Sequence, residues 1–186
     1  MPIDAIIKDA STRMDKSVES LRNELHRIRT GKATTALLDA VKVTAYGSVM
    51  PLNKVANISV RDVHTLNVQP WDRSLIPLIE KAILSSDLGL NPVNDGTVIR
   101  VPIPPLTAER RRDLVKLVRR FGEETKVALR NIRRDANEHL KKAEKEEHIS
   151  EDERKKAEKR VQDLTDKHIE TVDRILEAKE SEIMEV

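Results

Sequence analysis

Arginine and lysine side chains recur along one side of the segment from Leu106 to about Glu147. This basic line consists of Arg112, Lys116, Arg119, Lys126, Arg130, Arg134 and Lys141, with Arg133 at its edge. Arginine presents a planar fork of donors that grips a phosphate through two hydrogen bonds and can also stack on a base. Placed in a row on a helix, such groups suit the phosphate backbone of a nucleic acid.

The competing interpretation is that these charges only keep an exposed helix surface soluble. Two observations favour phosphate binding. Arginine dominates here, whereas the helix expected after residue 150 balances lysine with glutamate. Few acidic residues offset the charge between Ala128 and Arg134, because Glu124 lies upstream and Asp135 downstream. We therefore expect a nucleic-acid contact along this line.

Other residue types indicate little chemistry. The chain has no cysteine, so disulfides, thiolate nucleophiles and cysteine metal sites are excluded. Its five histidines are scattered without a metal spacing such as HExxH, and no phosphate-binding GxxxxGK[ST] loop occurs. Carboxylates alternate with lysines, as in EDERKKAEKR, which is typical of a solvated helix face. We expect no catalysis, no metal and no cofactor, with His168 at the edge of a core and Asn94 to Gly96 as a turn.

Apolar residues predict three long helices that carry the charged surface. The basic segment also carries, at helical spacing, Leu114, Leu117, Val118, Phe121, Ala128, Leu129, Ile132, Ala136 and Leu140. Residues 3–29 show a heptad seam that ends at Thr30-Gly31. Ser150 with Glu153 forms a capping box that begins a last helix, which runs to about Met184. The last two helices, of about 40 and 35 residues, are then roughly 50 to 60 Å long.

The middle of the chain, from about residue 36 to 105, has a different pattern. Short strands are predicted at residues 41–45, 58–60, 66–68 and 98–101, with a turn at Gly47-Ser48. Residues 72–86 form a short amphipathic helix that Asp72 caps. Pro102, Pro104 and Pro105 then bring the chain out extended. Trp71 is expected to pack against the small sheet, with an exposed binding anchor as the alternative.

None of the three long helices can bury its apolar stripe alone, so one three-helix bundle is the economical solution. The predicted fold is α+β: residues 1–30 plus 106–186 form the bundle, and residues 31–105 form an inserted small α/β domain. Two short connections join the domains, which predicts an elongated, L-shaped molecule with a hinge. The hinge residues are Thr30, Gly31, Pro104, Pro105, Arg110 and Arg111. For the last two, phosphate contact and a structural tie between the domains remain equally open.

Composition limits the classes of partner. Among 186 residues, 35% are charged and only 2% aromatic, which favours long solvated helices and argues against a base-stacking platform. The net charge is only +2, so affinity for nucleic acid must come from the placement of the arginines. The N-terminal stretch MPIDAIIKDA has no signal-peptide pattern, and no stretch reaches transmembrane length. A soluble, cytoplasmic protein without a membrane partner is expected.

Several motifs, in order along the whole chain, resemble the ribosome recycling factors of bacteria. They are RIRTGKA near residue 30, SDLGLNPVNDGTVIRVPIPPLTAERRRDLVK in the middle, and RNIRRDAN. The resemblance implies the same two-domain architecture and places Arg130, Arg133 and Arg134 on a surface that faces ribosomal RNA. Arg29 and Lys32 would flank the joint. Recycling factors more often have arginine at position 32, and lysine keeps the charge but loses the bidentate fork.

By this resemblance the chain binds the post-termination ribosome in the intersubunit space, with the bundle along large-subunit RNA. Together with elongation factor G, which supplies GTP hydrolysis, it would split the subunits and free messenger RNA and tRNA, acting as a monomer. Two other functions stay open: a coiled-coil adaptor that binds proteins, and a general RNA chaperone. The candidate RNA-binding residues are Arg29, Lys32, Arg112, Arg119, Lys126, Arg130, Arg133 and Arg134.

Overall fold

The computed structural model describes residues 2–146 and 148–185, and the contacts of the chain divide it into two compact units. The bundle unit combines the segment up to Ile28 with the segment from Ala108 onward. The sheet unit is Arg29–Thr107. One unit is helical and the other is built on β-strands, so the predicted α+β class is confirmed.

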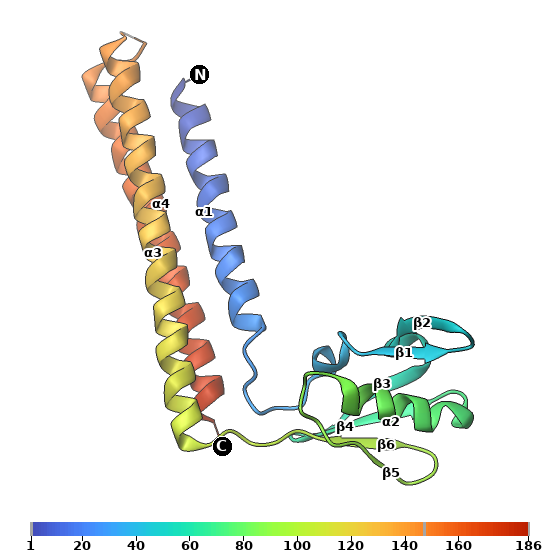
Figure 1. Cartoon of the computed structure of the whole chain (residues 1–186). Coiled ribbons are helices and arrows are strands. Elements are labelled where there is room, and N and C mark those ends of the chain that lie inside the picture. The colour runs from blue at the N-terminus through green and yellow to red at the C-terminus, as the bar shows by residue number, and fades with distance from the viewer. Residues whose placement is uncertain (1, 147, 186) are drawn as a thin grey trace. The chain divides into compact units, whose positions relative to one another are not determined.

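The bundle unit consists of three long helices that lie side by side, α1 (Pro2–His26), α3 (Ala108–Lys145) and α4 (Glu151–Met184) (Figure 1). Each helix buries one stripe, and none could cover it without the other two. The buried apolar residues of α3 are Leu114, Val118, Leu129, Ile132, Ala136, Leu140 and Ala143. Gly122 is buried as well, and Leu176 of α4 occupies the space that a side chain there would fill. The predicted three-helix bundle is confirmed.

The ends of these helices differ in detail from the prediction. Helix α1 ends at His26 rather than at residue 29, because the amide of Ile28 donates to the Leu25 carbonyl (3.1 Å) in a tighter final turn. Helix α3 begins directly after Thr107, the predicted cap. Its described end is Lys145, and the predicted end near Glu147 lies outside the described residues. The capping box of Ser150 and Glu153 is present at the start of α4.

The sheet unit contains a hairpin and a four-stranded antiparallel sheet. The hairpin pairs β1 (Lys42–Ala45) with β2 (Ser48–Pro51). The sheet has the order β3-β4-β6-β5, with bounds Ala56–Asp62, Thr65–Pro70, Ile99–Pro102 and Val93–Asn94. Short 3-10 turns occupy Thr35–Leu38, Leu52–Lys54 and Arg73–Leu75, and the last of these leads into helix α2 (Ile76–Ser85). Asp72 caps that turn by accepting from the amide of Ser74 (3.0 Å), so the predicted cap is confirmed at the 3-10 turn rather than on α2 itself.

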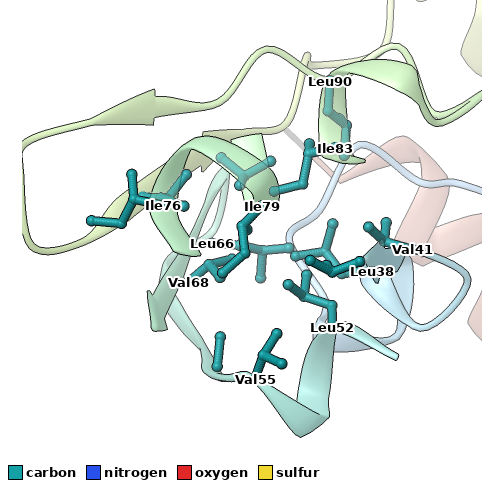
Figure 2. Close-up of a cluster of buried hydrophobic side chains, with 14 of the residues drawn as sticks. Leu38, Val41, Leu52, Val55, Leu66, Val68, Ile76, Ile79, Ile83 and Leu90 are labelled. Carbon is teal, nitrogen blue, oxygen red and sulfur yellow. The ribbon is translucent and has the colours of Figure 1, made fainter. Parts of the chain in front are cut away.

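One face of the four-stranded sheet packs on the apolar core of this unit (Figure 2). Helix α2 contributes Ile76, Ile79 and Ile83, and β4 contributes Leu66 and Val68. Side chains alternate between the two faces of a strand, so the intervening residues point the other way. On that outer face Asn57, Ser59, Gln69 and Arg100 are exposed. The sheet therefore keeps a polar side that faces solvent.

The prediction that Trp71 packs against the small sheet is wrong, because its side chain is 68% exposed. The backbone around it explains the difference. The Trp71 amide donates to the carbonyl of Val55 (3.2 Å), and Asp72 is held in the cap that begins the next turn. Pro70 takes the buried position at the end of β4, so the following side chain points away from the core.

Candidate nucleic-acid interface

The predicted basic line of α3 divides into two structural sets, and the first is a free basic row on the exposed surface. Its members are Arg112, Lys116, Arg130, Arg134 and Lys141, all of them exposed. Within residues 2–146 and 148–185, no ion pair or hydrogen bond engages these five side chains. At 1.5 Å per residue the row extends about 44 Å along the helix axis. Unpaired cations in such a row are available to an external anion.

Arg130 and Arg134 of the free basic row are both arginines and lie one helical turn apart on the same side of α3. The row is interrupted by the exposed carboxylate of Glu123, which lies 3.8 Å from Lys126. Arginine at both positions of the pair offers two planar donor forks about 6 Å apart along the axis. This pair is the strongest candidate for adjacent phosphate contacts.

The second set, the α3–α4 ladder, pairs with side chains of the neighbouring helix. Its rungs join Arg119 to Glu180 (Nε to Oε1, 2.8 Å), Lys126 to Asp173 (Nζ to Oδ1, 2.6 Å) and Arg133 to Gln162 (NH1 to Oε1, 3.2 Å). The numbers rise along α3 while they fall along α4, so the two helices are antiparallel. The hydrogen bond with Glu180 raises the pKa of Arg119, which keeps that guanidinium charged.

The ladder changes what its three cations can offer to a partner. The Lys126 side chain is only 17% exposed and its charge is already balanced by Asp173. Arg119 remains 67% exposed beside Glu180, and Arg133 is half-buried. In the structure, these three residues hold α3 against α4. Contact with RNA remains a prediction for them.

Helix α1 is tied to the other two helices by similar pairs. Arg13 of α1 pairs with Asp135 of α3 at 3.0 Å. His168, which is predicted to lie at the edge of a core, has 12% of its side chain exposed and lies 2.7 Å from Asp15 of α1. Its other ring nitrogen lies 2.7 Å from the carbonyl oxygen of Leu164. This histidine thus joins α4 to α1.

Four of the residues predicted for the hinge, Thr30, Gly31, Pro104 and Pro105, lie in the sheet unit on its two connections, whereas Arg110 and Arg111 belong to α3 of the bundle unit. The chain leaves Arg29 and passes Gly31, whose φ of +78° is a left-handed conformation that favours glycine. A Cβ at Gly31 would lie 3.2 Å from the backbone nitrogen of Leu106 in the other connection. The outgoing and incoming connections therefore touch at this point.

The turn between β3 and β4 clamps both connections. The amide of Ala33 donates to the Val63 carbonyl and the amide of Ile103 donates to the His64 carbonyl, each at 2.7 Å. The His64 ring adds a third tie, since its Nδ1 lies 3.0 Å from the Gly31 carbonyl oxygen. We call this set the connection clamp. Sequence reasoning missed it, because pairing with a distant turn leaves no local pattern.

The remaining predicted residues lie around these connections. The Arg29 guanidinium donates to the Leu88 carbonyl (2.8 Å), so one arm of its fork is engaged. Lys32 and Thr30 are half-buried, and Pro104 and Pro105 are exposed. Arg110 is exposed and Arg111 half-buried in the first turns of α3. Arg29 and Lys32 thus belong to the sheet unit, separate from the free basic row in the bundle unit.

Other chemistry is sparse in the part of the chain that the structure describes. No three histidine, aspartate or glutamate side chains gather there in a way that could hold a metal ion. Among those same residues, each helix lacks the combination of length and apolar character that crossing a membrane requires. The arrangement is suited to binding through charge and shape.

Comparison with known proteins settles the family. The family model described as ribosome recycling factor matches residues 21–184. The chain belongs to the ribosome recycling factor family. The ribosome-recycling factor of Symbiobacterium thermophilum is 61% identical over 97% of this chain and 98% of its own length. That of Thioalkalivibrio sulfidiphilus is 58% identical over 98% and 99%.

Solved structures agree with this assignment. A solution structure of the ribosome recycling factor is 46% identical, with a TM-score of 0.76, and the match covers 100% of this chain and 99% of that one. Another structure presents models of the T. thermophilus ribosome recycling factor and the E. coli elongation factor G bound to the E. coli post-termination complex. Its matched chain is 48% identical, with a TM-score of 0.63 and full coverage of both chains. Ribosome recycling factors are translation factors and not enzymes, in keeping with a surface built for binding.

Proposed function

We propose that this chain binds the post-termination ribosome and splits its subunits together with elongation factor G, releasing messenger RNA and tRNA. GTP hydrolysis is the work of that partner. Membership of the family supports the proposal, as does the related structure that combines a recycling factor, elongation factor G and a post-termination complex. On this proposal the chain acts as a monomer in the cytoplasm, where ribosomes translate.

The observation that carries the RNA contact is the free basic row of α3. The arginine pair Arg130 and Arg134 and its three companions are exposed and have no partner among the described residues. A row about 44 Å long matches an extended phosphate backbone better than a small ligand. We assign it to large-subunit ribosomal RNA, read by its shape and phosphates rather than by its base sequence.

The α3–α4 ladder and the connection clamp support a mechanical role. Rungs spaced seven residues apart along α3 brace that helix against α4, so the bundle is suited to transmit force. The clamp fixes both connections to the sheet unit near Gly31 and Ile103. We therefore place the hinge outside the clamp, at residues 27–30 on one connection and 104–107 on the other. A translocase that pushes on the sheet unit would then move it as one body.

Sedimentation with ribosomes tests the proposal first. The full chain should pellet with post-termination ribosomes, and addition of elongation factor G and GTP should convert those ribosomes to free subunits. A coiled-coil adaptor would instead bind protein partners regardless of ribonuclease treatment. An RNA chaperone would bind free structured RNA as well as it binds ribosomes. Either pattern would contradict the proposal.

Salt dependence tests the free basic row itself. Each phosphate contact contributes roughly 0.7 to 0.9 to the slope of log affinity against log salt. The variant Arg130→Ala/Arg134→Ala should therefore bind ribosomes more weakly and lower that slope by roughly 1.4 to 1.8. The matched control is Arg174→Ala, an exposed arginine of α4 that is paired with Glu170 of its own helix at 2.6 Å. An equal effect of the control would remove the row from the contact surface.

A cross-link between the two units tests the hinge. The chain has no cysteine, so one cysteine introduced into each unit gives a single defined link. A panel of such pairs should keep ribosome binding and lose subunit splitting until the link is cleaved. Undiminished splitting by linked protein would rule out a role for movement at the connections.

A further inference from the structure

Trp71 combines a fixed backbone with an exposed ring. Its amide donates to the Val55 carbonyl at 3.2 Å, yet 68% of the side chain faces solvent. The next residue, Asp72, accepts from the hydroxyl of Tyr46 (2.8 Å), a second aromatic residue that is 71% exposed. Exposing two large rings forgoes the free energy that their burial would release. Such rings are suited to contact with a partner.

A groove of about 480 Å³ opens beside the Trp71 ring. Its lining consists of Asn57, Gln69, Pro70, Trp71, Arg73 and Thr97. Asn57 and Gln69 are direct partners across β3 and β4, so their amides lie next to each other on the solvent side of the sheet. An amide side chain both donates and accepts, as the edge of a nucleobase does.

The charge of this groove favours an anion. Arg73 is exposed, and within the described part of the chain no ion pair engages it. The carboxylates of Asp72 and Asp95 lie close to lining residues in the sequence but outside the lining, where other donors hold them. Asp72 accepts from Tyr46 and Ser74, and Asp95 accepts from the amides of Val98 (2.8 Å) and Thr97 (3.0 Å). The lining therefore offers one free cation and no carboxylate.

We propose that this groove binds an unpaired nucleotide of single-stranded RNA. The Trp71 ring stacks on the base, the amides of Asn57 and Gln69 hydrogen-bond to its edge, and Arg73 contacts the adjoining phosphate. Stacking on an aromatic ring is the usual way in which proteins hold unpaired bases. A protein hot spot would need an apolar lining around the anchor, whereas four of the six residues here are polar or charged.

This site lies in the sheet unit and does not depend on the free basic row in the bundle unit. It goes beyond the proposed function, since it adds contact with an unpaired base to the binding of folded RNA by shape. Binding at this site is tested with short oligonucleotides and without ribosomes. Its failure would leave the ribosome-binding proposal intact, and failure of that proposal would not affect its result.

Trp71 is the single tryptophan of the chain, so tryptophan emission of the full-length protein, excited where tyrosine does not absorb, reports on this groove alone. We expect single-stranded oligoribonucleotides to quench this emission with a saturable curve at low salt, where phosphate contacts are strongest. A blunt RNA duplex should quench far less, because its bases are already stacked. No quenching by single strands, or equal quenching by duplex, would overturn the proposal. Quenching by elongation factor G but not by oligonucleotide would assign the groove to a protein partner and overturn it as well.

Variants read by the anisotropy of a labelled oligoribonucleotide complete the test. Trp71→Ala should weaken binding roughly 5- to 150-fold, the range expected for loss of one stacked base, whereas Trp71→Phe retains a ring and should lose much less. Arg73→Ala should lower the salt slope by roughly 0.7. The charge-matched control is Lys81→Ala on α2, the helix that covers the opposite face of the sheet. If Arg73→Ala and Lys81→Ala weaken oligonucleotide binding equally, the effect comes from net charge alone and the site is refuted.

Discussion

Replacement of Gly31 by alanine is the sharpest test of the contact between the two connections. Gly31 is buried and has a φ of +78°, and a Cβ there would lie 3.2 Å from the Leu106 backbone nitrogen and 3.3 Å from its Cγ. A left-handed conformation costs a non-glycine residue about 1 to 2 kcal/mol. Crowding against a backbone atom that cannot rotate away adds about 1 to 3 kcal/mol. Together these terms predict a loss of about 2 to 5 kcal/mol in the free energy of unfolding of the sheet unit.

Gly47 provides a matched control for this substitution. Its φ of +77° is nearly the same, but no atom lies within 4 Å of the position that a Cβ would take. Gly47→Ala should therefore show only the conformational cost of about 1 to 2 kcal/mol. The difference between the two variants isolates the close approach of the connections.

Denaturant unfolding followed by tryptophan fluorescence measures both variants in the full-length chain. Trp71 is the single tryptophan and lies in the sheet unit, so its emission follows the unfolding of that unit. Circular dichroism of the helices follows the bundle unit in the same samples. If Gly31→Ala costs no more than Gly47→Ala, the two connections are not packed against each other at Gly31 and that contact is refuted.

Two further predictions concern caps at helical turns. Hydrogen bonds from the Ser74 hydroxyl, the Tyr46 hydroxyl and the Ser74 amide hold the pKa of Asp72 below its usual value. A lowered carboxyl pKa stabilises the fold above pH about 4, and that contribution is lost as the pH falls through the folded-state pKa. Asp72→Asn should flatten the acid limb of a plot of unfolding midpoint against pH. An unchanged limb would show that the Asp72 carboxylate does not contribute to stability. Ser150→Ala breaks the capping box with Glu153 and should lower bundle stability by about 0.5 to 2 kcal/mol, measured by thermal unfolding; a variant as stable as the parent would deny the box an energetic role.

The long helices could be predicted because each repeats its pattern many times. A heptad seam over more than three turns in α1, or the double stripe of α3, leaves little room for another structure. Short elements lack that repetition. Strand β5 has only two residues, Val93 and Asn94, and β2 (Ser48–Pro51) is exposed or half-exposed throughout, so neither carries an alternating pattern. Their pairing comes from neighbours that are distant or joined by a tight turn.

The division of the basic line into the free basic row and the ladder could not be predicted from α3 alone. Lys126 and Arg130 are one turn apart and look equivalent in the sequence. Only the register of the antiparallel α4 places Asp173 2.6 Å from Lys126 and no acid within ion-pair distance of Arg130 among the described residues. Which cation is free is therefore a property of the pair of helices. A stripe on one helix predicts a charged face, and its partner decides how much of that charge remains available.

Trp71 is the most informative failure, because the general rule for a lone tryptophan beside a small sheet would bury it. Burial would have required a position on the core face of the sheet, but Pro70 already occupies that position at the end of β4. The hydrogen bond to Val55 and the Asp72 cap then hold the backbone with the side chain on the solvent side. Sequences that fold well tend to break a local rule where function requires it. An exposed ring held this firmly is for that reason better explained by a ligand than by chance, and the amides and free arginine beside it indicate which ligand.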